Sequence, residues 1–554
     1  MFQIQTTSNF SELSEKITNM LINIYCAKCI GIQAVPVNVE VDINSGIGIH
    51  LVGLADIAVK ESLLRIMTAL QSLGFHIPGK KIVINLAPAD MHKNGSGYDL
   101  PIALGIIAAS GQRNLPALTR YIIMGELGLD ASVRPVAGAI PIAEFSAKMG
   151  LDGCILPKES AMEASELQGI KVFGVSTLTD VLRVLEDPDN AEDLLTKPVT
   201  NDEKVQYSYM DFADIVGQEE AKRGLEIAAA GGHNAIMIGS PGSGKTSMAK
   251  AMIGIMPQMT TEEAIETSKI YSVAGQHHTS RGLIRERPFR APHYSASLAA
   301  IIGGGNGDNI LPGEVSLAEN GILFLDEMSL LPKSVMEALR SPLEDRKVTI
   351  SRLRSKVDYP ASFMLVAASN PCPCGYFGIR GRCSCTPAQR QSYISRLSGP
   401  IMDRIDIQLT VNPVPPSKLV HKQRAETSSA IAARVRVARE IQACRFAGCS
   451  IHVNAEMSGE MADRFCNLTD ECKVLIEELA NRLGLSARAF TRILKLSRTI
   501  ADLEVAREIC EKQGSYEEYI QEQLANDCSW PHIQPRHIME AVGYRFLDRM
   551  NMMM

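Results

Sequence analysis

The sequence AIMIGSPGSGKT at residues 235–246 decides the fold of this chain. Its first five residues form an apolar run of strand length, and residues 247–255 follow with a helical pattern. An apolar strand that enters a helix through Gly-x4-Gly-Lys-Thr is typical of the phosphate-binding loop of nucleotide hydrolases. The backbone N–H groups of such a loop and the N-terminus of its helix face nucleotide phosphates. The predicted ATP ligands are Gly239, Ser240, Pro241, Gly242, Ser243, Gly244, Lys245 and Thr246.

Two further apolar runs end in polar residues suited to nucleotide hydrolysis. Residues 322–325 lead into Asp326 and Glu327, about 80 residues after the loop, and residues 363–368 precede Asn370. Strands of this kind alternate with helices in a P-loop core, so we predict an α/β ATPase core with its site at the strand ends.

The residue types assign a role to each of these positions. Lys245 would contact the β- and γ-phosphates of ATP, Thr246 would ligate Mg²⁺, and Asp326 would hold Mg²⁺ through water. Glu327 would polarise the attacking water, and Asn370 would orient it. Alternatively, Asp326 and Glu327 begin a helix, and Asn370 with the following proline forms a turn.

Composition limits the class of protein. A length of 554 residues suggests roughly three to four domains. A net charge of −6 argues against a uniformly basic nucleic-acid-binding protein but leaves room for a local basic patch. No apolar run approaches the roughly 18–20 residues of a membrane span, and the first twenty residues lack the pattern of a secretory signal. We therefore expect a cytoplasmic protein without a membrane partner.

Several longer segments resemble one family of ATPases. The central segments are FRAPHYSASLAAIIGGG at 289–305, LPGEVSLAENGILFLDE at 311–327, AASNPCPCGYFG at 367–378 and SGPIMDRIDI at 398–407. Together with residues 52–62, 84–112, 125–138 and 485–504, they resemble the magnesium-chelatase-like AAA+ ATPases of the YifB/ComM family. The resemblance covers about residues 24–545.

The resemblance and the residue pattern together divide the chain into an α/β protein of several parts. The expected parts are an N-terminal extension (1–23), a ribosomal-S5-like domain similar to the Lon protease domain (24–184), a polar linker (185–208), the AAA+ core (209–412), a helical lid domain (413–549) and a tail (550–554).

The first of these domains is expected to lack proteolytic activity. When the Lon catalytic pattern is placed on residues 93–99, the nucleophile position falls on Gly97 and the lysine position on Ile140. Ser96 is one residue away from the required place, a shift of more than about 3 Å along the chain.

The resemblance implies that the ATPase site is completed by arginines. Arg404 matches the arginine finger that a neighbouring subunit supplies in the related MCM helicases, and Arg396 is the alternative. Arg488 matches the lid arginine called sensor 2, and Arg492 lies one helical turn further on. A surface salt bridge is the other role open to the finger candidates. A finger supplied between subunits implies a homo-hexamer.

A basic hairpin is the predicted contact with DNA. Residues 346–352 and 356–361 have strand patterns on either side of a short tip. In the MCM and chelatase branch such hairpins line the central pore, where Arg352, Arg354 and Lys356 would meet the phosphate backbone. A solvated basic hairpin is the alternative. The arginines of the helix at 430–446 (Arg434, Arg436, Arg439 and Arg445) are interpreted either as a second nucleic-acid contact or as a solvated face.

Four cysteines after Asn370 predict a metal site. Cys372 and Cys374, with Cys383 and Cys385, bracket an eight-residue loop, and four thiolates suit tetrahedral Zn²⁺. Four reduced cysteines without metal are the alternative.

The residues leave three functions open. The first is an ATP-driven motor on single-stranded or branched DNA, of the helicase or branch-migration type that the resemblance to ComM implies. The second is an ATP-dependent protein remodeller or regulator, although the sequence lacks an aromatic pore loop that would grip peptides. The third is a chelatase motor, against which stand the Lon-like domain and the cysteine cluster.

Overall fold

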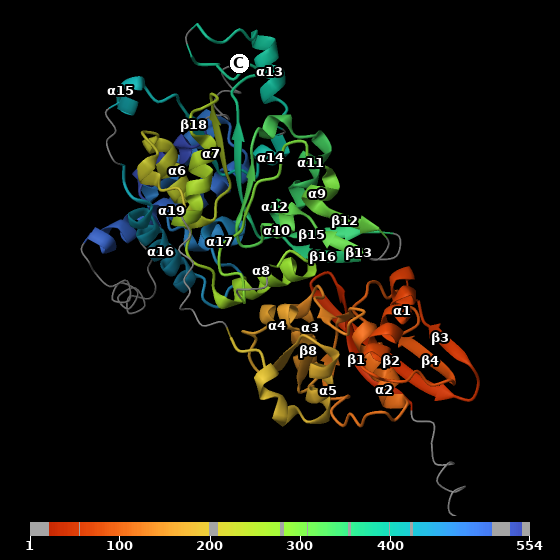
Figure 1. The fold of residues 1–554 in the computed structure, drawn as a ribbon. Coiled ribbons are helices and arrows are strands. Elements are labelled where there is room, and N and C mark those ends of the chain that lie inside the picture. Colours follow the sequence, from red (N-terminus) through yellow and green to blue (C-terminus); the bar gives the residue numbers. More distant parts are fainter. Residues whose placement is uncertain are drawn as a thin grey trace, which may run out of the picture.

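The computed structural model describes residues 21–54, 56–198, 209–277, 282–306, 309–352, 356–379, 381–397, 399–420, 425–511 and 532–545. Several sequence expectations fall outside these ranges, namely residues 1–20 of the extension, 199–208 of the linker, the hairpin residue Arg354 and the tail. The described residues form an N-terminal α/β unit, a central α/β unit and a C-terminal helical unit (Figure 1).

Within the described ranges, the N-terminal unit is built on a seven-stranded mixed sheet. Its strands, in sheet order, are β3 (Gly48–Val52), β4 (Lys81–Ala87), β2 (Gln33–Asn44), β1 (Ile22–Ile30), β5 (Tyr121–Ile123), β8 (Gly153–Pro157) and β9 (Lys171–Val175). β2 pairs antiparallel with β1 and β4, and the other neighbours are parallel. Side chains of β4 alternate between buried and partly buried, as on a sheet with one closely covered face.

Helices and two short strands complete this unit. They are α1 (Ile57–Ser72), α2 (Asp99–Ala109), β6 (Glu126–Leu127), β7 (Val133–Arg134), α3 (Ala139–Lys148), α4 (Lys158–Glu163) and α5 (Leu178–Glu186).

The first part of the expected linker is folded. A 3₁₀ helix spans Pro188–Leu194, and Ala191 within it is fully buried. The backbone N–H of Thr196 donates to the carbonyl of Val172 in β9 at 2.9 Å. Residues up to about 196 therefore belong to the N-terminal unit, because they pack and hydrogen-bond along its edge strand β9.

The central unit contains a five-stranded sheet in the part of the chain that the structure describes. In sheet order its strands are β11 (Phe289–Arg290), β14 (Ile322–Leu325), β17 (Met364–Ser369), β10 (Ala235–Gly239) and β18 (Ile407–Val411). Every pair is parallel. A parallel sheet covered on both faces requires continuous apolar runs, and β10, β14 and β17 are buried along their whole length.

Helices and two hairpins surround this sheet. The helices are α6 (Glu219–Gly231), α7 (Lys245–Ala251), α8 (Thr261–Val273), α9 (Leu298–Ile302), α10 (Glu314–Leu317), α11 (Lys333–Ala338), α12 (Arg340–Asp345), α13 (Pro387–Ile394) and α14 (Gly399–Met402). The hairpins are β12 (Gly303–Asn306) with β13 (Asn309–Pro312), and β15 (Lys347–Ser351) with β16 (Lys356–Pro360).

The C-terminal unit is helical and shares a hydrophobic core with the central sheet. Its helices are α15 (Pro416–Val420), α16 (Ser428–Arg445), α17 (Gly459–Phe465), α18 (Asp470–Leu483), α19 (Ala487–Glu511) and α21 (Pro535–Gly543). Both α16 and α19 pack against α6, which leads into β10.

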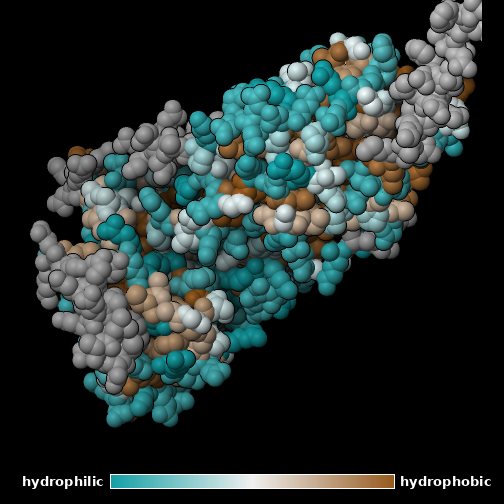
Figure 2. All heavy atoms as spheres, turned by 90° about the horizontal axis from the view of Figure 1, so that it is seen from below, coloured by the Kyte–Doolittle hydropathy of each residue, from teal (hydrophilic) through white to brown (hydrophobic). Residues whose placement is uncertain are grey.

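Among the described helices, none combines the length and the apolar character that a bilayer crossing would require. The face shown in Figure 2 is mainly hydrophilic, with hydrophobic side chains in small groups between hydrophilic ones.

The N-terminal unit packs against α8 of the central unit (Figure 1). Lys269 of α8 forms an ion pair with Glu144 at 2.6 Å. The Ser272 hydroxyl donates to the buried carboxyl of Glu163, and the Ser272 carbonyl accepts from the N–H of Gly138 at 3.0 Å. In the turn between β1 and β2, Ile32 packs against the core cluster that includes the β15–β16 hairpin.

The carboxyl of Glu163 makes this boundary sensitive to pH. Burial raises its pKa to about 7, and the hydrogen bond from Ser272 only partly opposes this. Because the folded-state pKa lies above the ordinary value of 4.5, the contribution of this carboxyl to folding stability is fully present below pH 4.5. That contribution is lost as the pH rises to about 7. The loss is about 1.4 kcal/mol per pH unit in that window. Glu163→Gln should remove this component of the pH dependence of thermal unfolding.

The matched control is Glu166→Gln, which removes a carboxylate paired with Arg285 at the same boundary. It should keep the wild-type slope between pH 5 and 7. Identical slopes for wild type and Glu163→Gln would show that Glu163 does not titrate in this window.

Candidate nucleotide-binding site

The carboxyl ends of three neighbouring strands meet at one edge of the central sheet. β10 pairs in parallel with β17, and β17 pairs in parallel with β14. The loop after β10 therefore lies at the same edge as Asp326, which follows β14, and Asn370, which follows β17. Ligands of open parallel sheets bind at this edge.

The loop after β10 is shaped by its glycines and by Lys245. Gly244 has a φ of 94°, a conformation that L side chains avoid, and it allows α7 to begin at once. Lys245 Nζ donates to the carbonyls of Gly239 at 2.7 Å and Ser240 at 3.0 Å. Burial lowers the pKa of Lys245, while the charges of Asp326 and Glu327 oppose the shift. The ammonium group is held inside the loop, where it can face a phosphate.

The residues predicted to hold Mg²⁺ lie together. The Thr246 hydroxyl donates to Asp326 Oδ2 at 3.0 Å, and Asp326 Oδ1 accepts from the N–H of Glu327 at 2.9 Å. Mg²⁺ prefers hard oxygen ligands, so the Thr246 hydroxyl would ligate this ion and Asp326 beside it would hold the ion through water. The residues present fit this ion.

Glu327 has an unusual backbone conformation. Its φ of 49° and ψ of 43° place it in the left-handed region. Such a conformation costs about 1–3 kcal/mol in a non-glycine residue, and such residues cluster at active sites. It supports the assignment of this glutamate to hydrolysis.

Asn370 lies between Lys245 and the cysteine loop. Its Oδ1 accepts from Lys245 Nζ at 3.4 Å. Beyond it, Gly375 approaches the phosphate-binding loop so closely that a Cβ atom there would lie 2.7 Å from Pro241 Cδ. The cysteine loop and the phosphate-binding loop are thus in direct contact.

The cysteines after Asn370 are brought together. The four Sγ atoms lie within 4.8 Å of one another, and the shorter separations are 3.3, 3.7 and 3.9 Å. A zinc ion with four Zn–S bonds of about 2.3 Å requires S–S separations of about 3.8 Å. A hydrogen bond from the Tyr376 backbone is the largest influence that lowers the pKa of Cys374 to about 6, whereas the pKa of Cys383 is raised and that of Cys385 is raised to about 11 beside the neighbouring thiols. The set Cys372, Cys374, Cys383 and Cys385 fits Zn²⁺.

Arg404 lies at the opposite, amino end of the parallel strands, just before β18 begins. It is 8% exposed, and its guanidinium pairs with Glu344 and donates to the Pro400 carbonyl. It lines a cavity of about 490 Å³ between the central and helical units. The other basic residues of the cavity wall are Arg346, His452, Arg492 and Lys495, and the acidic ones are Glu344, Asp406 and Glu456.

The cations of this cavity are incompletely paired. Among the described residues, Arg404 Nε is buried without a hydrogen-bond partner, and Arg492 Nη1 has only an ion pair with Asp406 at 3.4 Å. Burial lowers the pKa of Arg492 and of Lys495, partly offset by Asp406. Buried cations of this kind favour an anionic ligand.

The other two arginine candidates are exposed. Arg396 lies just past the C-terminal end of α13, outside the cavity wall. Arg488 is in the first turn of α19, four residues before Arg492. Because Arg492 contacts Asp406 next to β18, α19 begins at the edge of the sheet opposite the phosphate-binding loop of its own chain. A role for Arg488 at that loop is therefore not supported by this arrangement.

The predicted basic hairpin is present, with Arg352 and Lys356 exposed at the ends of β15 and β16. A second hairpin, β12–β13, lies beside it, and the Tyr359 hydroxyl donates to the Ile310 carbonyl at 2.7 Å to join the two. The sequence does not predict this second hairpin, because its glycine-rich strands have no alternating pattern.

The interpretation of α16 as a nucleic-acid contact or a solvated face is wrong for most of its arginines. Arg434 pairs with Glu226 at 2.7 Å, and Arg439 donates to the Ala229 carbonyl at the end of α6. Arg445 is buried against Asp502. Only Arg436, of the four, is exposed. Most of the charged side of this helix lies inside the protein, against α6 of the central unit and against α19.

The N-terminal unit brings no reactive pair together at the residues named from the sequence. Ser96 donates its hydroxyl hydrogen to the carboxylate of Glu126, Gly97 has no side chain, and Ile140 is fully buried in α3.

Comparison with known families matches three stretches of the chain. Residues 211–419 match the family described as magnesium chelatase, subunit ChlI. Residues 39–160 match subunit ChlI of Mg-chelatase, and residues 425–515 match its C-terminal family.

Whole-length relatives give a closer match. The chain is 39% identical to YifB of Salmonella typhimurium over 531 residues, covering 95% of this chain and 97% of that protein. It is 40% identical to the competence protein ComM of Haemophilus influenzae over 533 residues, covering 95% and 98%. A more distant match is the DNA replication licensing factor mcm-6 of Caenorhabditis briggsae, 23% identical over 287 residues, covering 49% and 31%.

Two substitutions test the assignment at the sheet edge. Lys245→Ala should abolish ATP binding because it removes the counter-charge to the phosphates. Glu327→Gln should leave binding unchanged and lower turnover by about 100-fold or more, because the amide cannot polarise water. Binding of a fluorescent ATP analogue and phosphate release should be measured for both. Near-normal turnover of Glu327→Gln would overturn the role of this residue.

Proposed function

The chain belongs to the magnesium-chelatase-like AAA+ family that includes YifB and ComM, and we propose that it is an ATP-hydrolysing motor that acts on DNA as a homo-hexameric ring. Its N-terminal unit is proposed to be a Lon-like domain without proteolytic activity, and its C-terminal unit the lid. Its substrates are ATP and single-stranded or branched DNA.

One observation carries this proposal: the phosphate-binding loop and the arginine cavity lie at opposite ends of β10. The loop follows Gly239, whereas Arg404 and Asp406 lie beside Asn234, which precedes the strand. Arg404 therefore completes a site only when another copy of the chain places its nucleotide against this cavity. Repeating that contact around a closed ring gives each subunit one site and one arginine donor.

The residues at the sheet edge suit hydrolysis of ATP. Lys245 would neutralise the β- and γ-phosphates, Glu327 would take up the developing charge of the attacking water, and Asn370 would orient that water. Mg²⁺, when bound by Thr246 and Asp326, supplies charge neutralisation at the phosphates. The neighbour's Arg404 would stabilise the charge that develops in the transition state.

The two adjacent hairpins support DNA as the ligand. Arg352 and Lys356 are exposed cations on the hairpin, and Arg354 belongs to the same basic segment. The names of the relatives, a competence protein and a DNA replication factor, fit the same class of ligand.

We also propose that the cysteine loop binds one Zn²⁺ through Cys372, Cys374, Cys383 and Cys385. Metal analysis of the reduced protein should give about one zinc per chain, since four thiolates satisfy the ion. The double variant Cys383→Ser with Cys385→Ser should lose it. Cys444→Ser, which changes an exposed cysteine of α16, is the matched control and should keep the metal. Equal zinc content in all three proteins would remove this assignment.

The DNA assignment is tested by neutralising the hairpin. Replacing Arg352, Arg354 and Lys356 by alanine should weaken binding of single-stranded DNA. It should also flatten the slope of log affinity against log salt by about 0.7 for each phosphate that is no longer neutralised. Basal ATPase should persist, because the hairpin lies apart from the phosphate-binding loop. Fluorescence anisotropy across a salt series gives both the affinity and the slope.

A control triple variant carries the same charge change elsewhere. Lys60, Lys148 and Lys171 are exposed on the N-terminal unit, and their replacement by alanine should leave the slope unchanged. If the hairpin variant binds DNA with the wild-type slope, DNA does not contact this hairpin. ATPase stimulation by unfolded protein would then favour the remodeller.

A further inference from the structure

A pair of residues between α6 and β10 holds the segment that carries Arg404. Asn234 Nδ2 donates to the Arg404 carbonyl at 2.9 Å, and the Asn234 carbonyl accepts from the N–H of Asp406 at 3.0 Å. His233 Nδ1 lies 3.0 Å from Asp406 Oδ2. The backbone of Arg404 and both the backbone and the side chain of Asp406 are thus fixed by two consecutive residues.

Both ring nitrogens of His233 are engaged. The ring is fully buried, and its Nε2 lies 2.8 Å from the Thr499 hydroxyl of α19. Because a carboxylate only accepts hydrogen bonds, Nδ1 donates to Asp406, and Nε2 shares a hydrogen bond with the Thr499 hydroxyl. Gly231 leaves the necessary space, since a Cβ there would lie 2.3 Å from Nε2 and 2.5 Å from the Thr499 oxygen.

Asp406 links His233 to Arg492 in the arginine cavity. One carboxylate oxygen accepts from His233, and the other pairs with Arg492 at 3.4 Å. Burial alone would raise the pKa of Asp406, but the His233 hydrogen bond and the charges of Arg492 and Lys495 lower it to about 2. The carboxylate therefore stays ionised and keeps Arg492 oriented at neutral pH.

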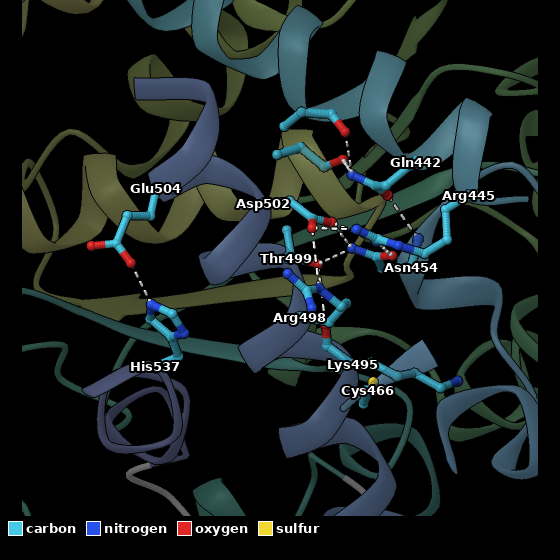
Figure 3. Close-up of polar contacts among 12 residues, drawn as sticks. Gln442, Arg445, Asn454, Cys466, Lys495, Arg498, Thr499, Asp502, Glu504 and His537 are labelled. Carbon is cyan, nitrogen blue, oxygen red and sulfur yellow. Dashed lines mark hydrogen bonds and ion pairs between the residues drawn. The ribbon is translucent and has the colours of Figure 1, made fainter. Parts of the chain in front are cut away.

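Thr499 connects the same histidine to a buried network of the helical unit. Asn454 donates to the Thr499 hydroxyl at 3.1 Å and to Asp502 at 2.9 Å, and Asp502 also pairs with Arg445 and Arg498. Figure 3 shows these side chains converging between α16 and α19. Arg492 lies on the same helix as Thr499, so its helix and its carboxylate partner are anchored at one point.

We propose that His233 is a positioning residue that holds Asp406, and through it Arg492, beside Arg404 in the geometry needed at the nucleotide of the neighbouring subunit. This inference rests on the proposed function, in which those arginines act between subunits. His233 does not touch that nucleotide, and its effect on hydrolysis is exerted at a site that its own chain does not bind.

A matched pair of substitutions separates the hydrogen bond from the packing of the ring. In His233→Asn the amide nitrogen occupies the place of Nδ1 and keeps a donor for Asp406. In His233→Gln the amide reaches the place of Nε2, near Thr499, and no donor remains for Asp406. Both variants remove the ring, so a purely structural role predicts similar losses in melting temperature and in activity for both.

The positioning role predicts a difference in turnover. A displacement of about 1 Å in a catalytic group can lower the rate about 100-fold. His233→Gln should lower kcat about 10- to 100-fold with unchanged binding of an ATP analogue. His233→Asn should retain most of the kcat. Equal kcat for the two variants at equal melting temperature would overturn the inference.

A mixing experiment locates the defect. Lys245→Ala subunits have no working site but intact arginines. Mixed with His233→Gln subunits, they should restore hydrolysis, because they supply ordered arginines to the intact loops of the His233→Gln chains. No gain over the separate proteins would place the defect in the variant's own site and reject the inference.

A control mixture of Arg404→Ala with Lys245→Ala subunits tests the exchange of arginines between subunits separately from the role of His233. Restored hydrolysis in this control supports the exchange of arginines between subunits, whatever the result for His233. No restoration in the control would reject the exchange of arginines itself, and the proposed role of His233 would fall with it.

Discussion

The parallel pairing of β10 with β17 and β18 is the constraint on which the site depends. This register brings the ends of β10, β14 and β17 to one edge, where Lys245, Asp326 and Asn370 meet. It also fixes the start of β18, and with it Arg404, at the other edge. A strand of five residues spans about 16 Å at 3.3 Å per residue. The phosphate-binding loop and Arg404 of one chain therefore lie at opposite ends of β10.

The helical unit is rigidly attached at the arginine end of the sheet. Arg439 and Gln442 donate to the carbonyls of Ala229 and Ala230, which the last turn of α6 leaves without helical partners. The buried pair of Arg445 and Asp502 adds a contact whose disruption would leave a charge uncompensated. The orientation of α19, and of Arg492 on it, is therefore set by the central unit. On the proposed function, Arg492 would be presented to a neighbouring subunit as part of a fixed surface.

The parts of the site that are local in sequence could be predicted, because their residue types carry the chemistry within one short segment. The phosphate-binding loop, the apolar strand before Asp326 and the cysteine spacing after Asn370 are of this kind. The arginines of α16 could not be assigned correctly, because helical periodicity gives the faces of a helix but not what covers each face. The link from His233 to Asp406 and Thr499 spans 173 and 266 residues, and no local pattern indicates such pairs. A lone histidine followed by asparagine carries no signal of its own.

The cysteine loop has a physical reason to lie where it does. Between the end of β17 and the start of α13 the chain has no helix or strand among its described residues, although the loop must hold Asn370 beside Lys245. Ordering the backbone of an unconstrained loop costs about 1–2 kcal/mol of conformational entropy per residue. Without a further constraint, Asn370 would not stay beside Lys245. Four thiolates on one metal would close the loop at Cys372, two residues past Asn370. Because Gly375 lies against Pro241, the metal site would then pack against the phosphate-binding loop. On this argument the zinc ion would act on hydrolysis by restricting Asn370, without touching the nucleotide.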